Sequence, residues 1–437
     1  MLLLASYYFY MNWHAEYALL LLSSTVITYF AALGIEHFTE RWKKRLCLTS
    51  SLVINLFILF LFKYYNFLGE NIMTAFDYFG IAIHIPEFTL LLPVGISFYT
   101  FQALGYSIDV YRGTTPVEKS FLTYALFVSF FPQLVAGPIE RSSNLLPQFK
   151  EKHKFDYEQT MQGVLLMIWG YFMKLCLADR CALYVDAVYN NIPMHNGASY
   201  LIASFLFPFQ IYGDFAGYSL IAIGVAKVLG FNLMENFRRP YLSCSLGEFW
   251  SRWHISLSTW FRDYVYIPLG GNRVSKTRCY FNLLITFIVS GIWHGANWTF
   301  FCWGTLHGLG LCIEKAAKIA KKKYSGAKRM LHWLITFILV CIAWIFFRAN
   351  NIGDAFSVLN GIITRQGVPY LRLADFLAIF IALTILLFKE ISDEWNIKIH
   401  LNASARIALR NVYLAFMICF IILFGVLGGD QFIYFQF

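Results

Sequence analysis

The sequence predicts an all-α fold, a multi-pass bundle of transmembrane helices. Of its 437 residues, 58% are hydrophobic and only 14% are charged, whereas a soluble domain carries about 25% charged residues. Apolar stretches long enough to cross a bilayer core, which takes about 20 residues per helix, recur from one end of the chain to the other. Together these observations exclude a soluble enzyme with a single anchor.

We expect about 10–12 membrane helices, some of them broken or re-entrant, within one domain that covers residues 1–437. The candidate spans lie at about 16–36, 47–68, 89–110, 119–138, 160–178, 198–230, 279–313, 331–348, 371–389 and 409–428. Residues 1–13 are apolar but too short to span, and they lack the basic region of a signal peptide. We expect them either to dip partway into the membrane or to follow a further helix.

The net charge of +10 is concentrated in short basic loops, at 41–45 and at 315–329, and the second loop includes Lys321, Lys322 and Lys323. The positive-inside rule predicts that these loops are cytoplasmic. Nucleic-acid binding is disfavoured, because the basic runs flank apolar spans without a folded basic domain. The nine cysteines form no CxxC pair and no Cys/His cluster at zinc spacing, so we expect no metal site.

Glycine and proline interrupt the apolar runs at 92–95, 131–133 and 136–138. In a membrane, broken helices persist only where protein or a water-filled cavity satisfies the freed backbone groups. These breaks therefore predict an internal cavity. Gln102 and Gln133 lie in the same apolar context and are candidates to line it, with an internal hydrogen bond as the alternative.

A polar core block is expected at about 207–310. Its segment 248–264 carries four charges and His254 among aromatic residues, and the pattern predicts one amphipathic helix with His254, Ser258 and Arg262 in a column. Each charge at the bilayer centre costs roughly 2.5–3.5 kcal/mol, so this helix cannot be a lipid-facing span. It should lie at the interface, with structural ion pairs, or re-enter the membrane and line a cavity.

The second polar site is His294, inside an apolar run from about 280 to 313 that exceeds one crossing. The run should break near 295–297, and the step from Gly291 to Gly295 should let another helix approach closely. A histidine inside a membrane is a functional candidate, and a structural histidine is the alternative. A histidine can remove the proton of a hydroxyl that attacks a thioester, at a worth of roughly 10²–10⁴ in rate. His307 is expected to serve packing.

Asp214 lies in the middle of a predicted span, where an ionised carboxylate is costly. We expect it to pair with Arg252 or His254. Because an internal ion pair would satisfy the carboxylate, a structural role is the alternative to a chemical one.

Five segments, at 95–102, 131–139, 210–218, 252–258 and 293–295, closely resemble the membrane-bound O-acyltransferase family, and within it the bacterial subgroup that O-acetylates alginate. The resemblance implies a tunnel through the helical bundle, with His294 as the catalytic histidine and His254 as a second catalytic residue. Candidates to line the tunnel or contact substrate are Trp293, Asn297, Arg252, Ser258, Arg262, Asp263, Asp214, Gln102 and Gln133.

By this resemblance the chain is expected to move an acyl group, expected to be acetyl, across the bacterial cytoplasmic membrane for O-acylation of an extracytoplasmic polysaccharide. The expected donor is a cytoplasmic thioester, acetyl-CoA, and no bound cofactor is expected. The chain has few polar loops from which to build a cleft for a polymer. A separate protein is therefore expected to place the acyl group, and the resemblance implies that this partner is an extracytoplasmic SGNH-type acetyltransferase; polysaccharide machinery and membrane lipids are expected partners as well.

Two other functions stay open. One is D-alanyl transfer to teichoic acid from a carrier-protein thioester, which would use the same fold. The other, from a different class, is a transporter or flippase, which would also need broken helices and buried charges. A transporter predicts inverted repeats, and none are visible in the sequence.

Overall fold

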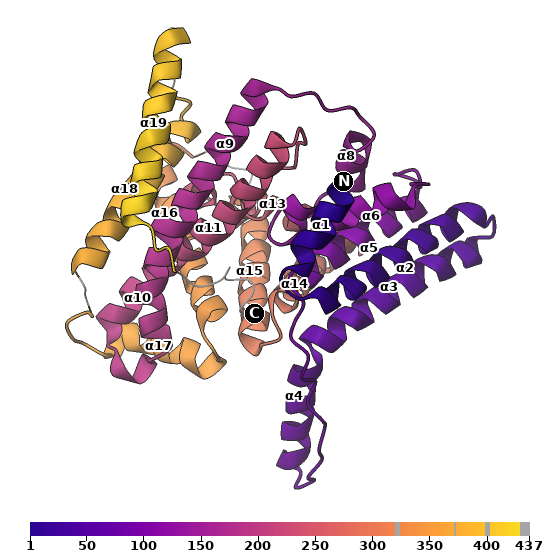
Figure 1. Ribbon diagram of the computed structural model, residues 1–437. Coiled ribbons are helices and arrows are strands. Elements are labelled where there is room, and N and C mark those ends of the chain that lie inside the picture. Colours follow the sequence, from indigo (N-terminus) through magenta and orange to yellow (C-terminus); the bar gives the residue numbers. More distant parts are fainter. Residues whose placement is uncertain (320–323, 371–372, 398–402, 429–437) are drawn as a thin grey trace. The chain divides into compact units, whose positions relative to one another are not determined.

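The computed structural model describes residues 1–319, 324–370, 373–397 and 403–428, and within these ranges every regular element is a helix (Figure 1). The predicted all-helical fold is confirmed. Lys321, Lys322 and Lys323 lie outside the described residues. Among the helices described, six are long and apolar enough to cross a bilayer: Ala15–His37, Arg41–Lys63, Tyr157–Tyr189, Gly197–Val228, Gly326–Arg348 and Ile407–Phe424.

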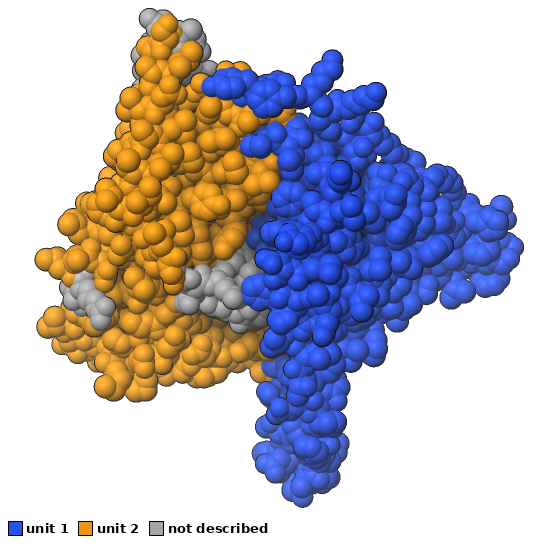
Figure 2. Space-filling view, in the orientation of Figure 1, with its two compact units in different colours: residues 1–157, 226–234 blue, residues 158–225, 235–437 orange. Residues whose placement is uncertain are grey.

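The chain divides into two compact units, coloured separately in Figure 2. Unit 1 comprises residues 1–157 and 226–234, and unit 2 comprises residues 158–225 and 235–437. Whether the two units act as the single domain expected from the sequence stays a prediction.

Unit 1 is built around α2, which packs against both α3 and α5. Its helices are α1 (Leu2–Met11), the 3₁₀ turn η1 (Ala15–Tyr17), α2 (Ala18–His37), α3 (Arg41–Lys63), α4 (Tyr65–Tyr78), α5 (Ile96–Arg112), α6 (Phe121–Ser129), α7 (Phe131–Leu134) and α8 (Ser142–Gln148). The predicted break near 131–133 is confirmed, because α6 ends at Ser129 and α7 begins at Phe131. Gly95, at φ 74°, starts α5, and a Cβ there would lie 2.6 Å from the carbonyl oxygen of Leu134.

Unit 2 contains the remaining helices, apart from the first residue of α9 and the last three residues of α11. They are α9 (Tyr157–Tyr171), η2 (Phe172–Ala178), α10 (Asp179–Tyr189), η3 (Ile192–Met194), α11 (Gly197–Val228), η4 (Pro240–Leu242), α12 (Leu246–Arg252), α13 (Ile255–Phe261), η5 (Arg262–Tyr266), α14 (Lys276–His294), α15 (Trp298–Ala316), α16 (Gly326–Arg348), α17 (Ile352–Thr364), α18 (Leu373–Glu394) and α19 (Ala403–Phe424).

The first long helix of unit 2 runs through a π-helical turn, η2, between α9 and α10. Glycines let α11 approach it closely, since a Cβ on Gly217 would lie 2.8 Å from the carbonyl oxygen of Gly170. Lys174 lies on η2 and is buried at this contact. The π-turn is thus held against a glycine-lined face of α11.

The prediction of one amphipathic helix over 248–264 is wrong. Helix α12 ends at Arg252, and α13 begins at Ile255. Between them Trp253 is extended, and His254 adopts the left-handed conformation at φ 43°. The aromatic periodicity continues across the break, so it gave no sign that the backbone changes direction there.

The predicted break in the run from 280 to 313 is confirmed. Helix α14 ends at His294, and α15 begins at Trp298, so the two form a hairpin. Close approach at Gly291 is also confirmed: a Cβ there would lie 2.2 Å from the carbonyl oxygen of Phe300 on α15. Gly295 packs instead against the ring of Phe300, with a Cβ position 2.1 Å from the nearest ring carbon.

We predict that Gly291→Ala destabilises the α14–α15 hairpin by about 1–3 kcal/mol, the usual cost of overpacking. The added methyl group meets a backbone oxygen, which cannot move without shifting α15. The measurement is the thermal unfolding midpoint of the purified protein in detergent. Gly310→Ala on α15 is the control, since its methyl group meets only the flexible end of Leu246. Equal losses in both variants would contradict the interpretation.

Candidate functional site

His254 is fully buried at the break between α12 and α13. Its Nδ1 lies 3.1 Å from Oδ1 of Asn236. The ring of Phe215, on α11, meets it edge-on at 4.6 Å between centroids. Burial lowers the pKa of His254 to about 3, so the imidazole is neutral at physiological pH.

His294 is the last residue of α14 and is 2% exposed. Three aromatic rings surround it edge-on: Trp293 at 5.0 Å, Trp303 at 5.0 Å and Phe347 at 5.3 Å between centroids. These rings come from α14, α15 and α16. The end of α14 therefore holds a histidine in the apolar interior of unit 2.

Trp293 joins the two histidines. Its ring lies 6.3 Å from the ring of His254 and 5.0 Å from that of His294, between centroids. It is itself 4% exposed. The structure thus brings together, around one indole, the two residues that the sequence analysis ranked first and that lie 40 positions apart.

A cavity of about 410 Å³ also lies in unit 2; its lining includes Ile255, the residue after His254, but neither histidine and not Trp293. Apolar side chains form most of its wall, and its polar members are Ser251, Ser258, Thr259, Arg262, Tyr266, Thr286 and Ser290. Ser290 is on α14, one turn before His294. A largely apolar cavity with a few polar groups is typical of small-molecule binding sites.

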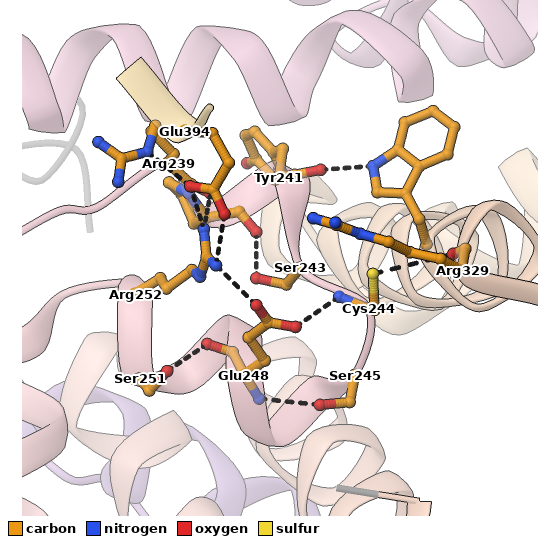
Figure 3. A network of polar contacts seen from close by, with 12 residues as sticks. Arg239, Tyr241, Ser243, Cys244, Ser245, Glu248, Ser251, Arg252, Arg329 and Glu394 are labelled. Carbon is orange, nitrogen blue, oxygen red and sulfur yellow. Dashed lines mark hydrogen bonds and ion pairs between the residues drawn. The ribbon is translucent and has the colours of Figure 1, made fainter. Parts of the chain in front are cut away.

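Arg252 belongs to an ion-pair network at the end of α12 (Figure 3). Its guanidinium donates to Glu248 at 2.7 Å and to Glu394 at 2.9 and 3.0 Å, and Glu394 also accepts from Arg239 at 2.8 Å. The hydrogen bonds from Arg252 and Arg239 lower the pKa of Glu394 to about 2. The network joins α12 to the end of α18, and the part of Arg252 in a tunnel or in substrate binding stays a prediction.

The prediction that Asp214 pairs with Arg252 or His254 is wrong. Asp214 accepts instead from Nζ of Lys174 at 2.6 Å, and Lys174 also contacts Asp179 at 2.7 Å. All three side chains are buried. Arg252 is engaged by Glu248 and Glu394, and Nδ1 of His254 faces Asn236.

The other predicted residues of unit 2 make local contacts. Asn297 caps α15, accepting from the backbone N–H of Thr299 at 3.0 Å. Arg262 lines the cavity and pairs with Asp263 at 2.7 Å. Ser258 also lines the cavity, and its hydroxyl donates to the carbonyl oxygen of Trp253 at 3.1 Å, which satisfies part of the helix break.

Gln102 and Gln133 lie in unit 1 and contact each other. Nε2 of Gln133 donates to Oε1 of Gln102 at 3.0 Å, and both amides donate to the carbonyl oxygen of Phe127. This is the internal hydrogen bond considered as the alternative for them. Their part in a tunnel stays a prediction.

His307 packs as expected. It is 1% exposed, and its Nδ1 accepts from Nε1 of Trp250 at 3.3 Å. Its ring lies 5.0 Å from that of Trp303, which also contacts His294.

Asn236, Lys174 and Glu394 were not predicted as site residues from the sequence. Lys174 could have been predicted to be buried and paired, because it is a charged residue inside the predicted span 160–178. Glu394 lies beyond its predicted span, and Asn236 lies in a polar segment that no periodicity singles out. Their roles depend on contacts between residues far apart in the chain.

Comparison with known proteins gives a consistent family. The profile of the membrane-bound O-acyltransferase family matches residues 116–353. The chain is 42% identical to a probable alginate O-acetylase of Pseudomonas syringae, over 81% of this chain and 68% of that protein. It is 37% identical to a peptidoglycan O-acetyltransferase of Helicobacter pylori (85% and 75%) and 30% identical to a teichoic acid D-alanyltransferase of Streptococcus thermophilus (59% and 69%).

We predict that Glu394→Gln lowers stability at pH 7 by about 1.5–3 kcal/mol, the usual worth of hydrogen bonds to a charged group. Because the folded pKa of about 2 lies below the ordinary carboxyl value of about 4.3, this stabilisation is complete above about pH 4.3. It declines as the pH falls below about 4.3 and is gone below about 2, so part of it remains at pH 3.

The measurement is the thermal midpoint of wild type and variant in detergent between about pH 7 and about pH 3. The difference should persist at the acid end. Asp393→Asn is the control, because that exposed carboxylate pairs with Lys389 along the same helix, and an exposed pair should contribute little. A difference that vanishes near pH 5 would contradict the depressed pKa.

Proposed function

The chain belongs to the membrane-bound O-acyltransferase family, and we propose that it moves an acetyl group from acetyl-CoA on the cytoplasmic side of a bacterial cell membrane toward a polysaccharide on the other side. It is a membrane protein and an O-acyltransferase. The acetyl group, its donor and its destination are the proposal.

The relatives favour acetyl over D-alanyl transfer. The two O-acetylating relatives are 42% and 37% identical over more than four fifths of the chain, whereas the D-alanyltransferase is 30% identical over 59% of it. D-Alanyl transfer to teichoic acid from a carrier-protein thioester is the second candidate. The names of the relatives include three different polymers, so the proposal specifies the class of acceptor and leaves the polymer open.

The observation that carries the proposal is the pair of buried histidines around Trp293. We propose that His294 takes the proton of the acceptor hydroxyl while the hydroxyl oxygen bonds to the carbonyl carbon of the thioester. The carbon–sulfur bond then breaks, and the leaving thiolate receives the proton that His294 took up. His254, neutral at physiological pH, supplies a second nitrogen to position the substrate or to pass a proton.

Their surroundings support this chemistry. Aromatic rings exclude water from both imidazoles, which strengthens electrostatic interactions in the site and protects the thioester from hydrolysis. The cavity that Ile255 and Ser290 help to line has the size and the mixed lining that a small acyl donor group requires. The proposed tunnel would connect such a site to both faces of the membrane.

We predict that His294→Ala abolishes acyl transfer, and that His254→Ala lowers it at least 100-fold, in line with the usual worth of general acid–base catalysis. Both variants should insert and stay folded, because no charge is stranded. The measurement is CoA release from acetyl-CoA by the purified protein, with an SGNH-type transferase added to accept the acetyl group on its serine.

His195→Ala is the matched control. This histidine also belongs to unit 2, but it contacts the carbonyl oxygen of Ala187 and the ring of Tyr370. Its loss should leave turnover unchanged. Normal CoA release by His294→Ala would show that His294 is not the catalytic base.

We also predict that the protein does not acetylate the final polymer by itself. Its described polar loops are short, so it has little material for a cleft that holds a bulky sugar chain. A separate extracytoplasmic transferase of the SGNH type would take the acetyl group as an ester on its serine and pass it to the polymer.

The measurement is polymer acetylation in proteoliposomes in which the cytoplasmic face of the protein points outward. Acetyl-CoA is added outside the vesicles, and the polymer is enclosed within them. Without the second protein no acceptor serine is present, so we expect little CoA release and little polymer ester. Adding the SGNH-type transferase to the lumen should start CoA release and raise polymer ester in step with it. Efficient polymer acetylation by the membrane protein alone would disprove the relay.

A further inference from the structure

Asn236 lies in an extended segment that crosses the break between α12 and α13. Its carbonyl oxygen accepts from the backbone N–H of Ile255 at 2.9 Å, on the far side of the break. Two residues later, the N–H of Arg238 donates to the carbonyl oxygen of Arg252 at 2.9 Å, on the near side. The segment therefore holds the chain on both sides of His254.

The side chain of Asn236 points at the same break and is 1% exposed. Its oxygen accepts from the backbone N–H of Ser256 at 3.3 Å and from the Ser256 hydroxyl at 2.9 Å. Its Nδ2 donates to the hydroxyl of Ser219 on α11 at 3.0 Å. Because a backbone N–H can only donate, the atom facing Ser256 must be the oxygen, and the orientation of the amide follows from its contacts.

That orientation determines where the proton of His254 lies. The Asn236 oxygen is 3.1 Å from Nδ1 of His254 and can only accept a hydrogen bond. Nδ1 must therefore donate, and so it carries the proton. A neutral imidazole has one donor and one acceptor nitrogen, so Nε2 carries the lone pair.

The alternative tautomer would place a lone pair of Nδ1 against a lone pair of the Asn236 oxygen. It would also remove one of the hydrogen bonds that hold His254 in its left-handed conformation, which a non-glycine residue adopts only when its surroundings impose it. Rotation of the ring is opposed by Phe215, whose edge lies against it.

We propose that Asn236 is a positioning residue: it fixes His254 with its proton on Nδ1, so that Nε2 presents a lone pair for the transfer reaction. This inference rests on the proposed function only in that His254 takes part in transfer. Asn236 acts on the reaction through His254, as the outer partners of metal-bound histidines do for their ring orientation and tautomer.

The direct test is the tautomer itself. Nitrogen NMR of the detergent-purified protein, labelled with ¹⁵N at histidine, distinguishes protonated from unprotonated ring nitrogens. The spectrum of His254→Gln identifies the signals of His254 among those of the ten histidines. We expect a protonated Nδ1 and an unprotonated Nε2 in the wild type at neutral pH. A protonated Nε2 would overturn the inference, and this result needs no variant of Asn236 to fold.

The second test is rescue by a residue that keeps the acceptor. Asn236→Leu should lower CoA release about 10–100-fold. Asn236→Asp retains an oxygen that accepts from both Ser256 and His254, so it should recover most of that loss and keep the Nδ1–H signal. Equal losses in the two variants would show that the amide serves only to pack the loop.

Asn282→Leu is the matched control. Asn282 is also a fully buried asparagine of unit 2, but its amide donates to the backbone carbonyls of Leu269 and Gly271. Its loss should lower the thermal midpoint without changing the tautomer of His254. A changed tautomer there would mean that any loosening of unit 2 has this effect, and would overturn the specific role of Asn236.

The two hypotheses fail in different ways. If the wild type releases no CoA from acetyl-CoA, the proposed reaction is wrong, whatever the tautomer. If the wild type is active and His254→Ala is inactive, but the NMR spectrum shows a protonated Nε2, the reaction stands and the role of Asn236 falls.

Discussion

The break between α12 and α13 frees backbone groups that water does not reach, and their hydrogen bonds organise the candidate site of unit 2. Unsatisfied backbone groups in an apolar interior are costly, so a helix can break there only where the protein supplies substitutes. The carbonyl of Arg252 is satisfied by Arg238, and that of Trp253 by the hydroxyl of Ser258. Beyond the break, the N–H groups of Ile255 and Ser256 are satisfied by Asn236. One short segment thus holds a strained histidine, its neighbours and the start of α13.

The aromatic residues give this arrangement its chemical character. Phe215 meets His254 edge-on, and Trp303 and Phe347 meet His294 in the same way, which is a favoured geometry for such rings. Burial among these rings keeps His254 neutral at physiological pH. A neutral imidazole can accept a proton, whereas a protonated one cannot. The tight packing that stabilises unit 2 is therefore compatible with the chemistry proposed for it.

Local features were predictable from the sequence, and long-range pairings were not. The break at Gly295 followed from the length of an apolar run, and the close approach at Gly291 followed from the spacing of two glycines. The break at His254 was missed, because the aromatic stripe keeps its helical period across it. The pairings of Asp214 and Arg252 were also missed, since Glu394 lies 142 positions from Arg252 and nothing local relates them. Asn236 could not be singled out because its significance lies in one oxygen that three donors share.

The π-helical turn η2 determines the charge of the buried cluster around Lys174. Lys174 and Asp179 are five positions apart, and a regular α-helix would place them about 140° from each other around its axis. A π-turn brings residues at a spacing of five onto one face, and the lysine can then contact Asp179 while it also contacts Asp214 on α11. The register of this one turn decides whether the lysine meets one carboxylate or two. If the same residues were wound as an ordinary α-helix, without the π-turn, α10 would rotate by about 100° and Asp179 would be buried about 140° away from its cation.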